Sequence, residues 1–434
     1  MARVMKDSGL EILESIPSEW KTCRMKDVCR QAVGKPNRVG TKYVGLEHVS
    51  GWTGIATAID LNNATVESAQ HIQAGTICFS KLRPYLAKAF VAETDLLCTG
   101  ELLGMRALLT VVPRYALYWL LSHRFITAIN DGVSGTKMPR VDWATLSEMP
   151  FPLPSISQQR RIAAWLDIQT GRIDKRLVLL GNKRELLQEL RQGLIDEAML
   201  SGFAGSELVQ TGQTALPSMP VHWLLSKFKR RVFFREGPGI MAADFTETGV
   251  PLLRIGNIKP GLILMGGCNY LLPEKVERQW RQFKLRLGDI VISASASTGI
   301  VSEVGIDAVG AIPYTGLITL RPKSGVSKEY LKFFVISSTF LSQIEEYLKG
   351  STIHHFGPTH LRQMLISVPP VVEQNTIVGV LEKRITRIDA QITLIDQLEQ
   401  LIKQQRKAVI HDAVTGKIDL SAYVPPQSQV AVAA

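Results

Sequence analysis

The hydrophobic positions of this 434-residue chain follow a seven-residue period in two long stretches. In the first stretch the period is carried by Leu166, Ile173, Leu180, Leu187 and Leu194. The second stretch repeats it at Leu381, Ile388, Ile395, Ile402 and Val409. Unbroken heptads of this length are typical of coiled coils. The pattern therefore predicts two long helices that pack against each other, antiparallel, with these residues at the interface.

A second apolar seam is less regular than the first. Four apolar residues fit it, whereas four polar residues interrupt it: Ile162, Leu190, Ile377 and Leu398 against Gln169, Lys183, Arg384 and Gln405. Such interruptions can fix the register of a coiled coil or face another protein. Packing of each helix on its own globular domain stays open as the alternative.

Helix boundaries are marked by short polar signals. Ser155 with Gln158 predicts a capping box at the start of the first helix. Glu373 suits the positive end of the second helix, and Gly202 and Gly416 suit left-handed caps at the two ends. At 1.5 Å per residue, the first helix would be roughly 69 Å long.

The second half of the chain repeats the first. Residues recur at an offset of 215 (330 − 115 = 215), as in the pairs Tyr115 and Tyr330, Gln159 and Gln374, Asp174 and Asp389, and Arg191 and Arg406. A period of half the chain indicates a tandem duplication rather than a short-period solenoid. Such a duplication can fold with internal pseudo-two-fold symmetry.

Each half begins with a mixed, glycine-punctuated segment. Pro17-Ser18-Glu19-Trp20 in the first matches Pro220-Val221-His222-Trp223 in the second. Strands are expected at 76–80 and 289–293, and short helices at 115–129 and 330–348. We therefore expect a mixed α+β fold in which two α/β domains are separated by two long helices. The expected divisions are globular domains at 1–150 and 203–366, helices at 151–202 and 367–420, and a C-terminal tail at 421–434.

Composition narrows the function. Fifty Lys and Arg exceed 39 Asp and Glu, a net charge of +11, which suits a polyanionic partner without requiring one. The five cysteines form no CxxC pair and are not duplicated, so we expect reduced thiols and no metal site. No signal peptide or membrane span is expected either, which favours a cytoplasmic protein without membrane contact.

Motifs of catalysis are absent from the sequence. There is no Gly-rich loop ending in Gly-Lys-Ser/Thr, no HExxH and no Asn/Asp-Pro-Pro-aromatic motif of amino methyltransferases. The pair His354-His355 corresponds to Pro139-Arg140 in the first half, so it is not a shared ligand pair. The chain is therefore expected to bind rather than to catalyse.

Several segments then resemble one family, in the same order and twice over. They are Pro152–Ala163, Leu200–Phe203, Val368–Pro370, Glu373-Gln374, Thr386–Asp389 and Ala413–Ile418 in the helical regions, with Ser80–Leu86 and Arg254–Ile258 in the globular segments. These resemble the specificity (S) subunits of type I restriction–modification systems, and the resemblance extends from Ile16 to about Leu420.

The resemblance implies two target-recognition domains that each read one half of an asymmetric, bipartite site on double-stranded DNA. The helices would set the gap between the halves. Two modification (M) subunits, which methylate adenine N6, would dock on this chain, and restriction (R) subunits would join that core. S-adenosylmethionine, ATP and Mg²⁺ would be bound by those partners, and no cofactor by this chain.

Basic and small polar residues beside glycine or proline are the candidate DNA contacts, because Lys and Arg bind phosphate or guanine. The candidates are Lys81, Arg83, Lys88, Lys137 and Arg140 in the first domain, and Lys229, Arg230, Arg254, Asn257, Lys259, Ser295, Ser297, His354 and His355 in the second. For each of them, a solvated surface or a turn remains the alternative reading.

Two rival functions stay open on the sequence. One is a two-headed coiled-coil adaptor that does not recognise DNA. The other is a methyltransferase fused to a single recognition domain, which would need the amino-methyl motif that the sequence lacks. Salt-dependent DNA binding separates the first rival from the specificity subunit.

Overall fold

A computed structural model describes residues 3–32, 42–61, 69–132, 139–203, 205–294, 300–348 and 356–426. The chain divides into two compact units. Unit 1 comprises Met1–Gly181 and Asp396–Ala434, and unit 2 comprises Asn182–Ile395. Each unit therefore contains one globular head and one half of each long helix. This division differs from the expected one, which separated the heads from the helices.

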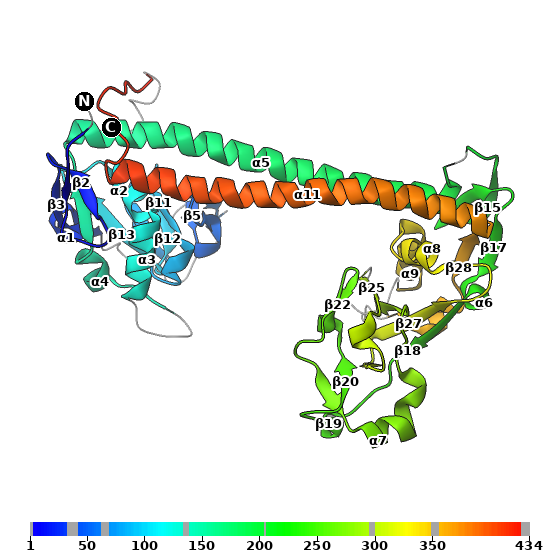
Figure 1. The fold of residues 1–434 in the computed structure, drawn as a ribbon. Helices are drawn as coiled ribbons and strands as arrows, with labels where there is room; N and C mark the ends of the chain where they lie inside the picture. Colours follow the sequence, from blue (N-terminus) through cyan, green and yellow to red (C-terminus); the bar gives the residue numbers. More distant parts are fainter. Residues whose placement is uncertain are drawn as a thin grey trace. The chain divides into compact units, whose positions relative to one another are not determined.

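The head of unit 1 is built on two four-stranded sheets, in the orders β11-β10-β13-β4 and β8-β5-β12-β9 (Figure 1). Their strands are β4 (Cys29–Ala32), β5 (Lys42–Val44), β8 (Ile59–Asp60), β9 (Ala69–Ile72), β10 (Ile77–Ser80), β11 (Ala89–Val91), β12 (Leu96–Thr99) and β13 (Leu102–Ala107). All neighbours are antiparallel except β5 and β12. The expected strand at 76–80 is confirmed as β10.

Three short pairs complete the strands of unit 1. They are β1 (Met5–Asp7) with β2 (Ser15–Pro17), β3 (Lys21–Arg24) with β14 (Pro150–Leu153), and β6 (Val49–Ser50) with β7 (Ile55–Ala56). The short helices α1 (Met25–Val28) and α4 (Trp143–Ser147) and the 3-10 turns η1 (Leu46–His48) and η2 (Pro84–Leu86) lie between them.

The head of unit 2 repeats this architecture, with sheets β18-β27-β24-β25 and β19-β23-β20-β26. The strands are β18 (Val232–Glu236), β19 (Phe245–Thr246), β20 (Val250–Leu253), β23 (Asn269–Leu271), β24 (Ile290–Ser293), β25 (Val301–Glu303), β26 (Ile312–Pro313) and β27 (Leu317–Pro322). The one parallel contact again joins the second sheet's β20 and β26. The expected strand at 289–293 is confirmed as β24.

Unit 2 also contains three further strand pairs, short helices and turns. The strand pairs are β15 (Leu208–Gln213) with β16 (Leu216–Pro220), β17 (Leu224–Lys227) with β28 (Leu365–Val368), and β21 (Ile258–Lys259) with β22 (Leu262–Ile263). The short helices are α6 (Phe228–Arg231), α7 (Pro273–Lys275) and α10 (Pro358–Leu361). A π turn, η5 (Val276–Trp280), follows α7. The 3-10 turns are η3 (Ala242–Asp244), η4 (Ile255–Asn257), η6 (Arg281–Phe283) and η7 (Ile306–Ala308). The three strand pairs and the helices α6 and α10 have counterparts in unit 1, whereas α7 and the turns η3, η5, η6 and η7 are additional.

Each expected short helix is in fact a pair. The segment 115–129 forms α2 (Pro113–Leu120) and α3 (His123–Asp131), and the segment 330–348 forms α8 (Lys328–Phe334) and α9 (Ser338–Leu348). Ser122 interrupts the first pair with an extended backbone, ψ 139°. Its counterpart Ser337 accepts the Phe340 amide through Oγ at 3.4 Å. A capping serine favours a helix start over an uninterrupted helix.

The two long helices are α5 (Ile156–Ser201), with 46 residues, and α11 (Val371–Val414), with 44. The expected capping box is confirmed, since the Ser155 amide donates to Gln158 Oε1 at 3.0 Å and the Gln158 amide to Ser155 Oγ at 3.3 Å. Gly202 and Gly416 close the helices with φ +61° and +75°. These left-handed values are the ones that glycine adopts without strain.

Within each unit the halves of α5 and α11 run antiparallel. In unit 1 the start of α5 shares a core with the end of α11, through Ile162 and Leu166 with Ile410 and Val414. In unit 2 the end of α5 shares a core with the start of α11, through residues such as Ile195 and Leu381. The seven-residue seam lies at this interface, although Leu180, Leu187, Leu194 and Val409 are only half-buried.

The expected second seam is confirmed at Ile162 and Ile377, which are buried, and is wrong elsewhere. Leu190 and Leu398 are 53% and 41% exposed, and Arg384 and Gln405 are also exposed. The buried positions are one residue further along, at Ala163, Thr170 and Ala198 on α5 and Val378, Ile385, Glu399, Arg406 and Ala413 on α11. Of the polar residues on this seam, Arg406 pairs with Asp174 across it, whereas Glu399 pairs with Lys403 on its own helix.

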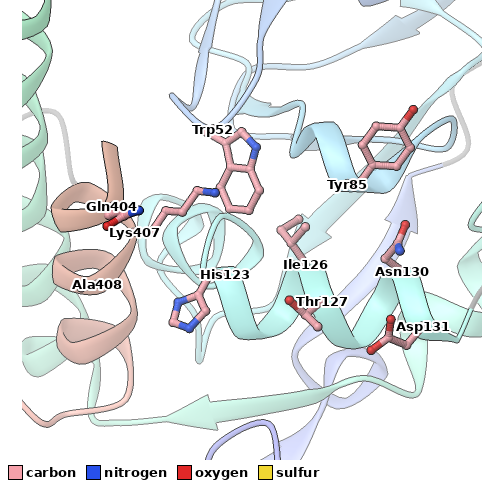
Figure 2. Close-up of a pocket in the computed structure, with 10 residues that line it drawn as sticks. All are labelled: Trp52, Tyr85, His123, Ile126, Thr127, Asn130, Asp131, Gln404, Lys407 and Ala408. Carbon is pink, nitrogen blue, oxygen red and sulfur yellow. The ribbon is translucent and has the colours of Figure 1, made fainter. Parts of the chain in front are cut away.

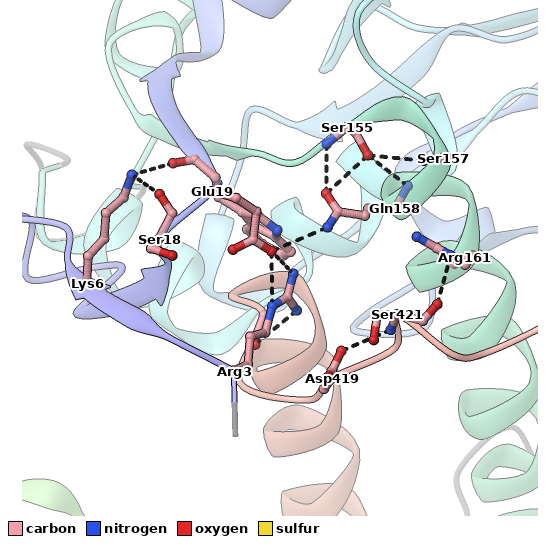
Figure 3. Close-up of polar contacts among 12 residues, drawn as sticks. Arg3, Lys6, Ser18, Glu19, Ser155, Ser157, Gln158, Arg161, Asp419 and Ser421 are labelled. Atoms are coloured by element: carbon pink, nitrogen blue, oxygen red, sulfur yellow. Dashed lines mark hydrogen bonds and ion pairs between the residues drawn. The ribbon is translucent and has the colours of Figure 1, made fainter. Parts of the chain in front are cut away.

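Unit 1 is closed by its N-terminal segment and the residues that follow α11 (Figure 3). Arg3 forms an ion pair with Glu19 at 2.5 Å, and its Nη1 donates to the Gly416 carbonyl at 3.5 Å. Arg161 on α5 donates to the Ser421 carbonyl at 2.8 Å. In unit 2, α5 is followed along the chain by β15, so the covalent chain connects the helix to the head. In unit 1 the contacts of Arg3 and Arg161 make the equivalent connection.

Candidate nucleic-acid interface

Two of the candidate lysines hold the head of unit 1 together. Lys81 Nζ donates to the Gly100 carbonyl and Lys88 Nζ to the Leu46 carbonyl, each at 2.6 Å. Both side chains are half-buried. Their ammonium groups therefore connect loops of the head, and because an ammonium has three N–H donors, each could contact a phosphate only from this tethered position.

Arg83 is the most available basic side chain of this region. It is exposed, and in the described part of the chain its guanidinium makes no hydrogen bond or ion pair. Its amide donates to the Pro139 carbonyl at 2.9 Å, and a β-bridge joins Leu82 to Arg140. Arg140 forms an ion pair with Glu101 at 3.1 Å. The structure thus brings Arg83 and Arg140 together, although they are distant in sequence.

The backbone around Arg83 is strained. Arg83 and Ala87, which flank the turn η2, have φ +49° and +47°. A left-handed conformation costs a non-glycine residue about 1 kcal/mol or more. Such strain is retained mostly where the surrounding structure fixes it, and it often marks functional loops. Between the two residues, Tyr85 and Leu86 are 45% and 36% exposed, so this turn presents a basic and an apolar side chain to solvent.

Candidates in the head of unit 2 are partly exposed. Lys229, Arg230 and Lys259 are exposed. Arg254 is also exposed, and its guanidinium carbon lies 5.1 Å from the centre of the Phe245 ring and 5.9 Å from that of Tyr314. Stacking on aromatic rings holds a guanidinium in place while leaving its N–H groups available.

Asn257 is a wrong assignment. Its side chain is 6% exposed, its Oδ1 accepts the Arg254 amide at 2.8 Å, and its Nδ2 donates to the carbonyls of Leu264 and Gly266 at 2.9 and 3.1 Å. A buried amide with every partner satisfied has nothing left for a base edge. Asn257 instead fixes the turn η4 that presents Arg254.

Five other candidates lie outside the residues that the structure describes. They are Lys137, Ser295, Ser297, His354 and His355. Their assignment to DNA contact stays a prediction.

Two ion pairs join the long helices at related positions. Arg406 Nε donates to Asp174 Oδ1 at 3.0 Å in unit 1, and Arg191 Nε donates to Asp389 Oδ1 at 3.0 Å in unit 2. The offset of 215 exchanges one pair for the other. The sequence shows these residues as repeats, but only the antiparallel alignment shows that each arginine pairs with the other copy's aspartate. Such pairs favour one register of the helices.

In unit 1 a loop of the head also contacts Arg406 of this ion pair. The loop Gly51–Gly54 joins β6 to β7, and Arg406 donates through Nη1 to the Trp52 carbonyl and through Nη2 to the Thr53 carbonyl, the latter at 3.2 Å. Lys407 Nζ lies 4.1 Å from the centre of the Trp52 ring, within a hollow of about 550 Å³ (Figure 2). Nothing in the sequence pattern predicted this contact.

Two negative findings concern the described residues alone. No group of three or more His, Cys, Asp or Glu side chains there could hold a metal ion. No helix among them has the length and apolar character that crossing a membrane requires.

Comparison with known proteins finds one matching domain and several similar chains. The family profile described as "Type I restriction modification DNA specificity domain" matches residues 242–404. The MjaVIII specificity subunit of Methanocaldococcus jannaschii is 24% identical over 300 residues, which cover 67% of each chain. The EcoDI specificity subunit of Escherichia coli is 26% identical over 155 residues, which cover 35% of this chain and 34% of that relative. The latter relative is thus matched over about a third of its length.

Solved structures share the fold. A chain from a study titled "Structural basis underlying complex assembly and conformational transition of the type I R-M system" has a TM-score of 0.71 and 20% identity, with 93% of this chain and 99% of that chain covered. The HsdS subunit from Thermoanaerobacter tengcongensis has a TM-score of 0.50 and 19% identity, with 93% and 98% covered. The profile match shows a type I restriction modification DNA specificity domain at residues 242–404, and the solved structures show that their fold extends over most of this chain.

Proposed function

We propose that this chain selects the DNA sequence on which a type I restriction–modification complex acts, with each head reading one half of an asymmetric, bipartite site on double-stranded DNA. The observation that carries the proposal is that two heads of one architecture present exposed arginines from different elements, η2 in the first head and η4 in the second. Arg83 on its strained turn belongs to the first head and Arg254 on its aromatic support to the second. Unlike heads imply unlike half-sites.

The chemistry of reading follows from these arginines. A guanidinium can donate two hydrogen bonds to guanine O6 and N7 in the major groove, and lysines can neutralise phosphates. Lys259, Lys229 and Arg230 in the second head and Arg140 in the first would supply salt-sensitive affinity. In this proposal the long helices set the number of base pairs between the two halves.

The helices also carry surface for protein partners. Leucines stand exposed on α5 and α11 at related positions, namely Leu179 and Leu401 in unit 1 (67% and 61% exposed) and Leu186 and Leu394 in unit 2 (64% and 63% exposed). In heptad terms all four flank the same side of the seam. In an antiparallel pair that side is one face, because like flanking positions of the two helices adjoin.

Exposed leucines at repeated positions support docking of two modification subunits, one at each set. An apolar patch of this kind marks a protein interaction surface more often than a nucleic-acid one. Restriction subunits would join through that core. S-adenosylmethionine, ATP and Mg²⁺ would be bound by those partners, so this chain would contribute recognition rather than catalysis, in the cytoplasm beside the host's DNA.

Mapping of methylated adenines tests the proposal. Genomes of a host with and without the gene, in the presence of its modification subunit, would be sequenced for N6-methyladenine. The expected result is one motif that has two short specific halves and an unspecified gap, present only with the gene. A methylation pattern that does not depend on the gene would contradict the proposal and would favour the adaptor.

A further inference from the structure

The two units differ where the head contacts the long helices, next to Arg406 in unit 1 and next to Arg191 in unit 2. In unit 1 the hairpin β6–β7 has a four-residue loop, Gly51–Gly54. In unit 2 the equivalent hairpin β21–β22 has only Pro260 and Gly261 between its strands. Trp52 and Gly261 hold the same place, since each follows the equivalent 3-10 turn by four residues and has a left-handed backbone, φ +67° and +72°.

The longer loop fills a defined space in unit 1. Arg406 binds the carbonyls of Trp52 and Thr53, and a Cβ added at Gly54 would lie 3.1–3.2 Å from the side chains of Leu121 and Leu117. The loop is therefore packed closely between α2 and α11, with glycine where it approaches most tightly.

The shorter loop leaves that space empty in unit 2. A cavity of about 670 Å³ lies there, lined by Arg191, Pro260, Gly261, Lys332 and Ile336 among others. By the offset of 215, Arg191 corresponds to Arg406, and Lys332 and Ile336 correspond to Leu117 and Leu121. The volume is that of a ligand site, and its lining matches the surroundings of the Trp52 loop.

Arg191 is placed to donate to backbone carbonyls, as Arg406 does in unit 1. Its Nε is held by Asp389, as the Nε of Arg406 is held by Asp174. In the part of the chain that the structure describes, the two Nη nitrogens of Arg191 have no hydrogen-bond partner. Adjacent backbone carbonyls would satisfy them, because that is what Trp52 and Thr53 provide in unit 1.

The charge of the cavity indicates a cation. In unit 1, Arg114 forms an ion pair with Asp167 at 2.8 Å. In unit 2 the equivalent residues are Glu329 and Glu382, both of which line the cavity, so two acids replace an ion pair. Glu329 has Lys328 at 3.6 Å, but Lys332 is held by Glu303 at 2.9 Å. A chain of net charge +11 thus keeps a locally acidic hollow, which disfavours phosphate.

We propose that this cavity of unit 2 binds a loop of a partner protein, which presents an aromatic side chain next to a lysine or arginine. The loop's backbone carbonyls would accept from Arg191, its aromatic ring would pack against Phe333 and Ile336, and its cation would lie beside Glu329 and Glu382. The partner completes in unit 2 what Trp52 completes in unit 1. The identification of this partner as a subunit of the same complex rests on the proposed function, whereas the binding chemistry does not.

A synthetic peptide tests the chemistry on the full-length chain alone. The probe is a fluorescein-labelled peptide containing Gly-Trp-Thr-Gly followed by arginine, and the readout is fluorescence anisotropy. We expect saturable binding that weakens at least tenfold when the peptide's tryptophan is replaced by alanine. Arg191→Gln and Glu382→Gln should each weaken it at least fivefold, whereas the exposed control Arg387→Gln should leave it unchanged.

A loop graft gives the sharpest control. Replacing Pro260 and Gly261 by Gly-Trp-Thr-Gly should let the chain fill its own cavity, which abolishes peptide binding and leaves the thermal midpoint equal or higher. Absence of saturable binding to the original chain, or binding that survives both the graft and Arg191→Gln, would overturn the proposal. Circular dichroism would verify that the graft folds.

Hydrogen exchange of the 258–263 hairpin then distinguishes the source of the occupant. Protection on addition of the modification subunit, without DNA, supports a protein loop. Protection by DNA alone, without any partner subunit, would contradict it. Neither result depends on whether the heads read two half-sites, so a failure here is separable from a failure of the proposed function.

Discussion

Unit 1 and unit 2 hold their helices to their heads by the same bonds at one place and by different bonds at another. Gln159, fully buried in unit 1, accepts the Val112 amide and donates to the carbonyls of Thr110 and Pro154. Gln374 does the same in unit 2 with the equivalent Ser327, Gly325 and Pro369. We call these hydrogen bonds of Gln159 and Gln374 the frame, and they are the same in both copies.

Elsewhere the copies have diverged. His411 contacts His123 in unit 1, with ring centres 4.7 Å apart. The equivalent residues of unit 2 are Asp196 and Ser338, and there Asp196 accepts from the amide and the hydroxyl of Ser338 at 2.7 Å each, at the start of α9. The comparison teaches that the hydrogen bonds of the frame are the same in both copies, whereas the bonds between a head's loops and the helices have changed.

The shared frame predicts equal losses in the two units. Gln159→Leu and Gln374→Leu each leave three backbone groups without their side-chain partner, and the Pro154 and Pro369 bonds among them are buried. At about 1–2 kcal/mol per buried group and less for the others, we expect each variant to destabilise its own unit by about 3 kcal/mol, measured as local opening free energies by hydrogen exchange of α2 or α8. The exposed Gln405→Leu serves as the control. A loss in one unit with none in the other would show that the frame is not shared.

The two arginines should differ. Arg406 is 6% exposed and binds Asp174 and two carbonyls, so Arg406→Ala should destabilise unit 1 by about 3 kcal/mol. Arg191 has side-chain exposure of 33% and its partner Asp389 of 50%, so Arg191→Ala should cost unit 2 less than about 1 kcal/mol. Hydrogen exchange in each unit measures both. Equal costs would indicate that the Trp52 loop adds nothing to unit 1.

Acid should affect unit 1 more than unit 2 because, among the residues that the structure describes, the one buried histidine, His411, lies in unit 1. Burial, with further contributions from His123, Lys417 and Arg124, lowers the pKa of His411 to about 4. The unfolded state then binds more protons than the folded state between about pH 6.5 and 4, so stability is present above pH 6.5 and is lost as the pH falls.

The expected loss is about 2 kcal/mol between pH 7 and pH 5. Its signature is faster hydrogen exchange in α3 and the end of α11, and His411→Phe should remove it. The exposed His222→Gln, in unit 2, is the matched control. If both units lost stability equally and His411→Phe changed nothing, His411 would not be the titrating group.

The last expected effect concerns DNA binding. Arg83→Ala should weaken binding by about 1–3 kcal/mol, and only to sites that contain the half read by the first head. Lys26→Ala, an exposed lysine paired with Glu148, should leave binding unchanged. Titration of duplexes with either half-site altered, at fixed salt, measures this. Unchanged affinity of Arg83→Ala at moderate salt would remove Arg83 from the contacts.

Periodicity predicted the parts of the fold that repeat. Leu166 and Leu381 mark the long helices, and Gly202 and Gly416 mark their ends, because a heptad and a left-handed cap depend on local sequence. The second seam was predicted correctly at Ile162 and Ile377 but misplaced elsewhere, where Arg406 and Glu399 are buried instead. A polar residue on a seam is visible as such only when its partner on the other helix is known.

The candidate site was less predictable. Arg83 is presented as expected of a residue beside proline, but the sequence could not show that Lys81 and Lys88 are held by carbonyls of distant loops. The same local signal, a polar residue beside glycine, made Asn257 a candidate, although its buried side chain forms hydrogen bonds that hold a turn. Such contacts depend on tertiary neighbours, and so does the fit of the Trp52 loop.

The central claim is that two unlike heads read two half-sites at an interval that the helices set. Adding one heptad to each helix at the same level, after Leu180 in α5 and after Glu399 in α11, tests it most directly. Seven residues add roughly 10 Å of helix, which corresponds to about 3 base pairs at 3.4 Å each. Methylated-adenine maps should then show both halves unchanged and a gap about 3 base pairs longer. A complex that still methylates efficiently at the original gap would contradict the account.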